Sequence, residues 1–258
     1  MTESSTVRDL LTLFNRAVRT APKVLAVDHE DGRLSYEELD QASDLLARDL
    51  IAKGVRSGNP IILVTAHGTR NVVALLSILK AGACYVPVDR GTWSRQRTDD
   101  VISRVTDCSL IINTTPEPFK CETHEVLHVT TAQQPNRVRQ NLPSGTPTAA
   151  PNDAACIIFT SGSTGRPKGV VLTHHGIANY AQTSPFNMDI AGGDRVLHIL
   201  SVAFDGKFIM HNTPTNPLRP LLPRNDGEFQ SFLETSGVFR VSHCCDGTAF
   251  CTPGMRCS

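Results

Sequence analysis

Residues 157–170 constrain the fold of this chain more than any other segment, because an apolar strand leads directly into a loop of glycine, serine and threonine. The segment reads Ile-Ile-Phe-Thr-Ser-Gly-Ser-Thr-Gly-Arg-Pro-Lys-Gly-Val and contains one lysine, Lys168. Such a loop offers backbone N–H groups, hydroxyls and an ammonium, and its glycines let the backbone approach a ligand closely. A polyphosphate requires these donors, so the segment predicts nucleotide chemistry.

The spacing within this loop excludes two common phosphate-binding motifs. A P-loop has glycine, four residues and then Gly-Lys-Ser/Thr, whereas Gly162 is followed five places later by Pro167. A dinucleotide fingerprint begins Gly-x-Gly and opens a helix, whereas residues 162–165 read Gly-Ser-Thr-Gly. A flexible surface loop is the plain alternative, but it would require neither Pro-Lys-Gly nor a buried strand on each side.

The remaining pattern, Thr-Ser-Gly-Ser-Thr-Gly-x-Pro-Lys-Gly, resembles the phosphate loop of the adenylate-forming (AMP-binding) superfamily. Residues 34–39 resemble the first core motif of its adenylation domains, and residues 79–89 resemble the second. The second motif has the form found in nonribosomal-peptide-synthetase-like enzymes. Residues 90–94, Arg-Gly-Thr-Trp-Ser, look like the fungal members that activate aryl or keto acids.

The resemblance implies that ATP with Mg²⁺ activates an amino or aryl carboxylic acid as an acyl-adenylate. It places the α-amino group of an amino-acid substrate beside Asp205, although an aspartate there could instead cap the next helix. We assign no catalytic residue and no metal ligand. The resemblance assigns the β,γ-phosphates of ATP to eight residues: Thr160, Ser161, Gly162, Ser163, Thr164, Gly165, Lys168 and Gly169.

Several conspicuous residues also have a purely structural interpretation. Ser35 and Glu38 form a capping box, so the first motif is also the start of a helix that Gly54 ends. His174 and His175 begin a predicted helix, and we interpret them as capping or surface residues rather than as a catalytic base. Buried thiols are common in strands, so we expect Cys84 and Cys156 to be core residues.

Helices and continuous apolar strands alternate along the first two hundred residues. This alternation predicts an α/β fold with a mostly parallel, covered sheet and flanking helices, an incomplete N-terminal subdomain of an adenylate-forming enzyme. The stretch 133–153 is rich in Pro, Asn, Ser and Thr and predicts an exposed loop. Helices are predicted over 6–19, from Ser35 to Gly54, over 71–80 and 94–105, and from His174; strands are predicted over 24–27, 60–65, 84–88, 109–113, 126–129 and 155–159.

The chain changes character after Asp205. We expect a partial adenylation domain over residues 1–205 and a divergent Pro- and Cys-rich tail, disordered or non-native, over residues 206–258. A retained intron, a frameshift, a gene-prediction error or a genuine short isoform would each produce such a change. Four cysteines lie near the end of the chain beside His243: Cys244, Cys245, Cys251 and Cys257. No two of them form a Cys-x-x-Cys pair, so we predict no metal site there.

The later motifs of the family do not occur in the 258 residues. Family members take the adenine pocket and the magnesium carboxylate from Tyr-Gly-Pro-Thr-Glu and a ribose-binding aspartate from Thr-Gly-Asp. A catalytic lysine comes from their small C-terminal domain. No Leu-Gly-Gly-x-Ser motif is present either, so we expect no phosphopantetheine site. We therefore expect a truncated domain that is inactive alone; the alternative is a non-catalytic remnant that binds nucleotide weakly or docks on a full-length synthetase.

Composition narrows the classes of partner. The chain has 25 Lys and Arg against 25 Asp and Glu, and no basic patch stands out, so we expect no nucleic-acid partner. Residues 1–5 are polar and lack an apolar signal core, and the longest apolar stretch, 72–79, is too short to cross a bilayer. We expect a cytoplasmic protein that meets nucleotide, a small carboxylic acid and other synthetase domains, but no membrane.

Overall fold

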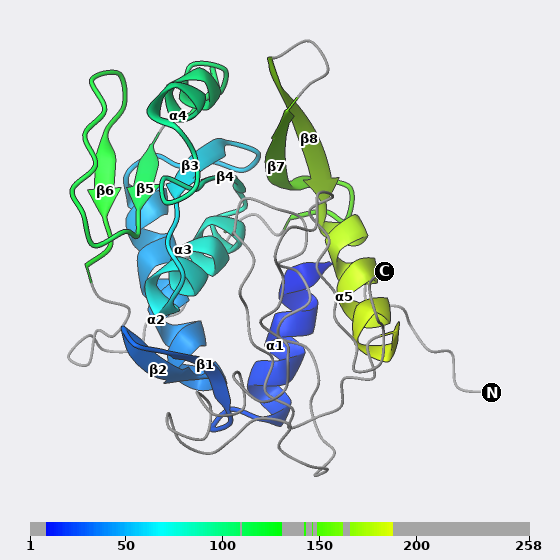
Figure 1. The fold of residues 1–258 in the computed structure, drawn as a ribbon. Coiled ribbons are helices and arrows are strands. Elements are labelled where there is room, and N and C mark those ends of the chain that lie inside the picture. The colour runs from blue at the N-terminus through cyan, green and yellow to red at the C-terminus, as the bar shows by residue number, and fades with distance from the viewer. Residues whose placement is uncertain are drawn as a thin grey trace, which may run out of the picture.

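The computed structural model describes residues 9–108, 110–130, 142, 146, 149–161 and 166–187. Asp205 and residues 206–258 lie outside this part of the chain. Helices and strands alternate in the first part of the chain, and the strands β5 to β8 then follow one another before the last helix (Figure 1). In order they are α1 (Leu10–Thr20), β1 (Leu25–His29), β2 (Gly32–Ser35), α2 (Tyr36–Ala52), β3 (Pro60–Val64), α3 (Thr69–Lys80), β4 (Cys84–Val88), α4 (Arg95–Ile102), β5 (Ile111–Asn113), β6 (Val126–His128), β7 (Ala154–Ser161), β8 (Pro167–Thr173) and α5 (His174–Asn187).

The main sheet of the described residues has the strand order β6-β5-β3-β4-β7-β8. Strands β6, β5, β3, β4 and β7 pair in parallel, and β8 pairs antiparallel with β7. The prediction of an α/β fold with a mostly parallel sheet is therefore confirmed. Strand β4 begins and ends at the predicted residues.

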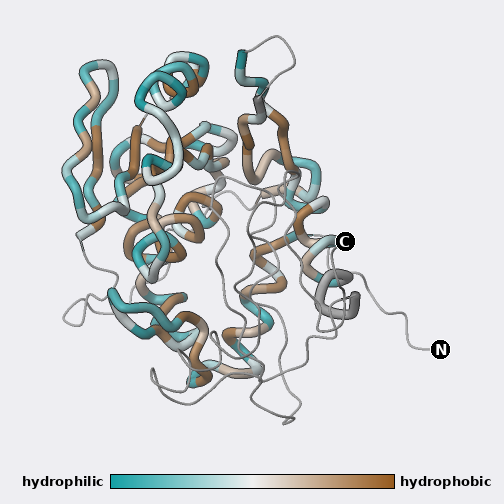
Figure 2. The backbone as a smooth tube through the Cα atoms, in the orientation of Figure 1, coloured by the Kyte–Doolittle hydropathy of each residue, from teal (hydrophilic) through white to brown (hydrophobic). Residues whose placement is uncertain are grey.

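Two cores cover the two faces of this sheet. Along β3 the side chains alternate between them: Ile61 and Leu63 pack with helices α2 and α3, whereas Ile62 and Val64 pack with Val101 of α4. A strand buried on both faces has no polar alternation, which explains its continuous apolar sequence. In Figure 2 the inner strands of this sheet are coloured largely as hydrophobic.

Helix α2 has the capping box that its sequence predicts. The backbone N–H of Ser35 donates to Glu38 Oε2 at 2.8 Å, and Glu38 N donates to Ser35 Oγ at 3.3 Å. The helix ends before Gly54, whose φ of 89° favours glycine. Helix α2 packs on α3, where the buried ammonium of Lys80 lies 2.7 Å from Asp40 and 2.6 Å from Asp44.

Two features of the strands differ from expectation. Strand β2 was not predicted, because it is short and begins at a glycine; it pairs antiparallel with β1. Strand β8, expected to be buried, is largely exposed: Val170 is 46% and Val171 is 56% accessible. Its place at the end of the strand order explains the exposure, since only β7 lies beside it in the main sheet of the described residues.

None of the helices in the described residues is both long and apolar enough to cross a membrane.

Candidate functional site

The hairpin of β7 and β8 frames the predicted phosphate loop. Thr160 lies opposite Lys168, and Ser161 lies opposite Pro167, where the loop begins and ends (Figure 1). The Thr160 hydroxyl donates to the carbonyl oxygen of Lys168 at 3.4 Å. Thr160 and Lys168 therefore share one face of the hairpin, as directly opposed residues do. The exposed side chain of Lys168 leaves its ammonium accessible to an anion.

The structure brings four of the predicted phosphate-binding residues together: Thr160, Ser161, Lys168 and Gly169. The other four (Gly162, Ser163, Thr164 and Gly165) and the predicted substrate-binding Asp205 lie outside the described residues.

Gly169 allows β8 to pack closely on β7. A Cβ atom at this position would lie 3.1 Å from Ile157 Cγ2 and 3.4 Å from Phe159 Cζ. The first of these distances is shorter than an ordinary carbon–carbon contact, so a larger residue would require the Ile157 side chain to shift by a few tenths of an ångström. The glycine of Pro-Lys-Gly thus has a packing role beside the phosphate role that we predicted.

The hairpin lies at the carboxyl edge of the parallel sheet. Strands β3, β4 and β7 run in the same direction, so their carboxyl ends, Val64, Val88 and Ser161, meet at one edge. Ligands of open α/β sheets bind in the crevice outside these ends. The predicted loop follows the last of them, which places it where such a sheet offers a binding site.

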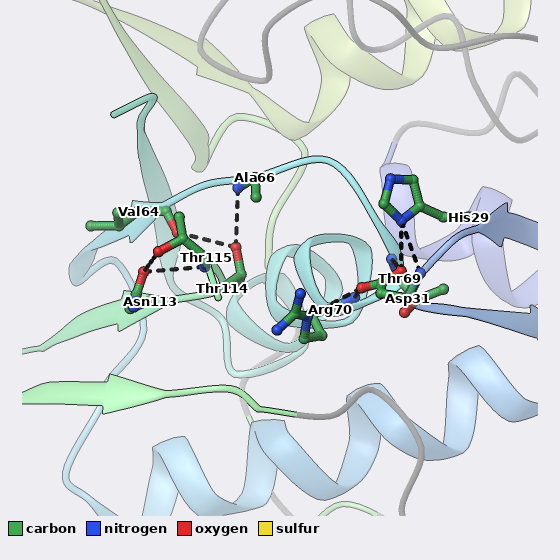
Figure 3. Close-up of polar contacts among 9 residues, drawn as sticks. All are labelled: His29, Asp31, Val64, Ala66, Thr69, Arg70, Asn113, Thr114 and Thr115. Atoms are coloured by element: carbon green, nitrogen blue, oxygen red, sulfur yellow. Dashed lines mark hydrogen bonds and ion pairs between the residues drawn. The ribbon is translucent and has the colours of Figure 1, made fainter. Parts of the chain in front are cut away.

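Hydrogen bonds fix the neighbouring connections at this edge (Figure 3). The Thr114 hydroxyl after β5 donates to the Val64 carbonyl at 3.1 Å and lies 3.4 Å from the donating N–H of Ala66. The carboxylate of Asp31, in the turn between β1 and β2, accepts from Thr69 N at 2.9 Å and from Arg70 Nε at 3.2 Å. Sequence reasoning missed Asp31, because its partners are far away in the chain.

His174 corrects one expectation. We expected it to be a capping or surface residue, but only 1% of it is exposed, and neither ring nitrogen has a hydrogen-bond partner among the described residues. Burial lowers the pKa of its imidazole, so the ring is neutral at pH 7. His174 begins α5, and this helix packs against α1, with Ala178 and Leu13 in one buried cluster. His175 is exposed, as expected.

Cys84 and Cys156 lie buried in β4 and β7, as expected. Within the described residues there is no group of three or more His, Cys, Asp and Glu side chains that could hold a metal ion. The cysteine-rich end of the chain lies outside the described residues.

Comparison with known proteins identifies the family of this chain. The family model described as AMP-binding enzyme matches residues 14–215. The chain belongs to the AMP-binding enzyme family. Adenylate-forming members of this family use ATP, typically with Mg²⁺.

Fungal peptide synthetases resemble this AMP-binding chain in sequence. Nonribosomal peptide synthetase gliP of Aspergillus fumigatus is 57% identical over 198 residues, which cover 76% of this chain and 9% of the synthetase. Nonribosomal peptide synthetase verP of Clonostachys rogersoniana is 48% identical, over 76% of this chain and 10% of that protein. The matched region thus spans about a tenth of these relatives, and it is an adenylation-domain-like fragment.

Solved structures agree on the fold. The N-terminal subdomain of Klebsiella oxytoca NpsA, in complex with 3-hydroxybenzoyl-AMSN, has a TM-score of 0.68 and 23% identity, covering 79% of this chain and 51% of that one. The nonribosomal peptide synthetase FmoA3, in its AMPPNP-bound form, has a TM-score of 0.66 and 26% identity over 80% of this chain and 22% of its own. The AMP-binding chain therefore has the fold of an N-terminal adenylation subdomain.

Proposed function

We propose that this AMP-binding chain contributes the ATP-phosphate-binding part of an adenylation domain that activates an amino or aryl carboxylic acid. The observation that carries the proposal is the β7–β8 hairpin, which holds Thr160 opposite Lys168 at the carboxyl edge of a parallel sheet. The AMPPNP-bound state of the similar FmoA3 also supports a nucleotide at this fold.

The proposed chemistry assigns the loop a role in charge stabilisation. An oxygen of the acid attacks the α-phosphorus of ATP; the bond to the bridging β-oxygen breaks, and pyrophosphate leaves with the electron pair. Lys168 supplies positive charge to the β,γ-phosphates, and the N–H and hydroxyl groups of residues 160–165 donate to their oxygens. The loop therefore binds ATP and stabilises the leaving group.

We further propose that the adenylation fold occupies residues 1–205 and that residues 206–258 do not contribute to it. The adenine, ribose and magnesium motifs of the family do not occur in these 258 residues. Residues of another segment would have to supply them. We therefore expect the 258-residue chain to bind ATP weakly and to form no acyl-adenylate alone.

Calorimetric titration of the 258-residue chain with ATP and Mg²⁺ tests the proposed binding. We expect Lys168→Ala to weaken ATP affinity about tenfold, because a cation that contacts phosphate is lost. Lys120→Ala is the matched control, since Lys120 is also exposed but lies far along the chain from the hairpin. A wild-type chain that binds no ATP, or equal affinities in both variants, would refute the phosphate-binding role.

Acid-dependent exchange of pyrophosphate into ATP tests the proposed inactivity. We expect no exchange above background with amino acids or aryl acids. Exchange that requires Lys168 would show that the chain completes the reaction, and our proposal of inactivity would be wrong.

The second candidate function is a non-catalytic partner that docks on other synthetase domains. The exposed valines of β8, Val170 and Val171, favour it, because an apolar edge strand can pair with another chain. Light scattering of the chain mixed with a complete fungal adenylation domain tests it. A complex that Val171→Lys abolishes would support docking, and two unassociated species would exclude it.

A further inference from the structure

The connection from β4 to α4 folds as a tight turn around Asp89. The carboxylate oxygen Oδ1 of Asp89 accepts from Gly91 N at 2.9 Å and from Thr92 N at 3.2 Å. The N–H of Trp93 donates to the Asp89 carbonyl at 2.8 Å. A Cβ atom on Gly91 would lie 3.2 Å from Asp89 Oδ1, so a small residue suits this position. This turn contains the Arg-Gly-Thr-Trp-Ser segment whose resemblance pointed only to a substrate class.

The turn and the start of α4 fix the position of Arg97. Ser94 caps the helix, and its Oγ accepts from Arg97 N at 3.2 Å. The indole of Trp93 is buried in the core between the sheet and α4. The guanidinium carbon of Arg97 lies 4.2 Å from the centre of that indole, which holds the cation by stacking.

Arg97 reaches from α4 to the end of β7. Its Nη2 donates to the carbonyl oxygen of Phe159 at 3.4 Å, two residues before the strand ends at Ser161. Strand β4, the parallel neighbour of β7, ends at Val88; because Tyr85 pairs with Cys156, Val88 is level with Phe159. The guanidinium therefore contacts β7 at the level where β4 ends, beyond which β4 offers no further backbone hydrogen bonds to β7.

We propose that Arg97 is a positioning residue that holds the end of β7, where Thr160 lies opposite Lys168, in place for ATP binding. The expected effect of Arg97 on ATP binding rests on the proposed function. Its effect on the end of β7 can be measured without nucleotide. The segment Arg-Gly-Thr-Trp-Ser acts through this arginine: its glycine permits the turn, its tryptophan stacks on the guanidinium, and its serine caps the helix.

Hydrogen exchange of the 258-residue chain without nucleotide tests the structural part. We expect Arg97→Ala to speed the exchange of amides in residues 157–170 about fivefold, because a charged hydrogen bond to the strand is lost. Exchange in α2 and α3 should not change. Arg95→Ala is the matched control: it removes the same charge from the same helix, at a side chain that is 96% exposed.

Unchanged exchange of the hairpin in Arg97→Ala would overturn the inference. Equal acceleration throughout the chain would also overturn it, since Arg97 would then stabilise the whole fold rather than position one hairpin. Arg97→Lys is a second variant in case Arg97→Ala does not fold. It keeps a charged donor but loses the planar stack on Trp93, so we expect its hairpin amides to exchange at a rate between those of the wild type and Arg97→Ala.

ATP titration of the same variants tests the functional consequence. We expect Arg97→Ala to weaken ATP affinity about fivefold while its melting temperature without nucleotide stays near that of Arg95→Ala. A lowered melting temperature with unchanged affinity would indicate a merely structural role and refute the inference. If the wild type binds no ATP, the proposed function fails, whereas the exchange experiment still decides the role of Arg97.

Discussion

At the scale of single residues, Asp31 links elements that are distant in the chain. Burial opposes ionisation of its carboxyl, but hydrogen bonds from Thr69 N, His29 and Arg70 N outweigh it and lower its pKa from 3.8 to about 2. The carboxylate thereby caps α3 from the β1–β2 turn. Gly68, with φ of 123°, makes room for it, since a Cβ atom there would lie 2.7 Å from either carboxylate oxygen.

The lowered pKa predicts how stability depends on pH. Because the folded chain holds the ionised form, Asp31 stabilises it fully above about pH 4, and this contribution disappears as the pH falls toward 2. We expect Asp31→Asn to cost about 1–2 kcal/mol of unfolding free energy at pH 7 and less at pH 3. Urea unfolding at the two pH values measures this; an equal cost at both would contradict it.

Replacement of Lys80 should lower the free energy of unfolding at neutral pH more than replacement of Asp31. Its ammonium is buried between the carboxylates of Asp40 and Asp44. Lys80→Ala leaves these two negative charges without their shared cation, so we expect a loss of about 3–5 kcal/mol in urea unfolding. Lys53→Ala is the control, because its partly exposed pair with Glu125 should contribute less than about 1 kcal/mol. Similar losses in both variants would refute this explanation.

At the scale of elements, the sequence predicted what local chemistry determines. The capping box of α2 and the apolar run of β4 are both local, and both were confirmed. Strand β2 was missed because its pairing with β1, rather than its composition, makes it a strand. The burial of His174 was missed because the burial of a residue at a helix start depends on tertiary packing, which the local sequence does not show.

The cap of α2 gives a prediction for one element. Ser35→Ala removes the side-chain acceptor of Glu38 N, and we expect a cost of about 1 kcal/mol in urea unfolding. Ser57→Ala, at an exposed serine between α2 and β3, should change stability by less than about 0.5 kcal/mol. If the two variants were equally stable, the capping box would contribute nothing measurable.

At the scale of the whole molecule, the sheet separates two cores, and buried thiols report on its integrity. Burial raises the pKa of Cys84 in β4 to about 11, so its thiol is protonated and unreactive at pH 8. We expect neither Cys84 nor Cys156 to react with iodoacetamide in the native chain and both to react in urea. Mass spectrometry of the labelled peptides measures this. Rapid native labelling of Cys84 would show that the covered sheet opens.

The candidate site could be predicted only in part at this scale. The loop was recognisable because its residue types suit phosphate, and the strand before it followed from its apolar character. The hydrogen bond from Arg97 to Phe159 was not predictable, because it joins residues that become neighbours only when β7 pairs with β4.

The strand order also has a consequence for how the chain acquires its structure. Strands β3 and β4 pair across a single intervening helix, whereas β7 pairs with β4 only after β5, β6 and their connections have been made. Closing the longer loop costs more chain entropy, and contacts distant in sequence slow folding. We therefore expect the β7–β8 hairpin to form early by itself and to dock late, so that the nucleotide loop is among the last parts of this subdomain to reach its final place.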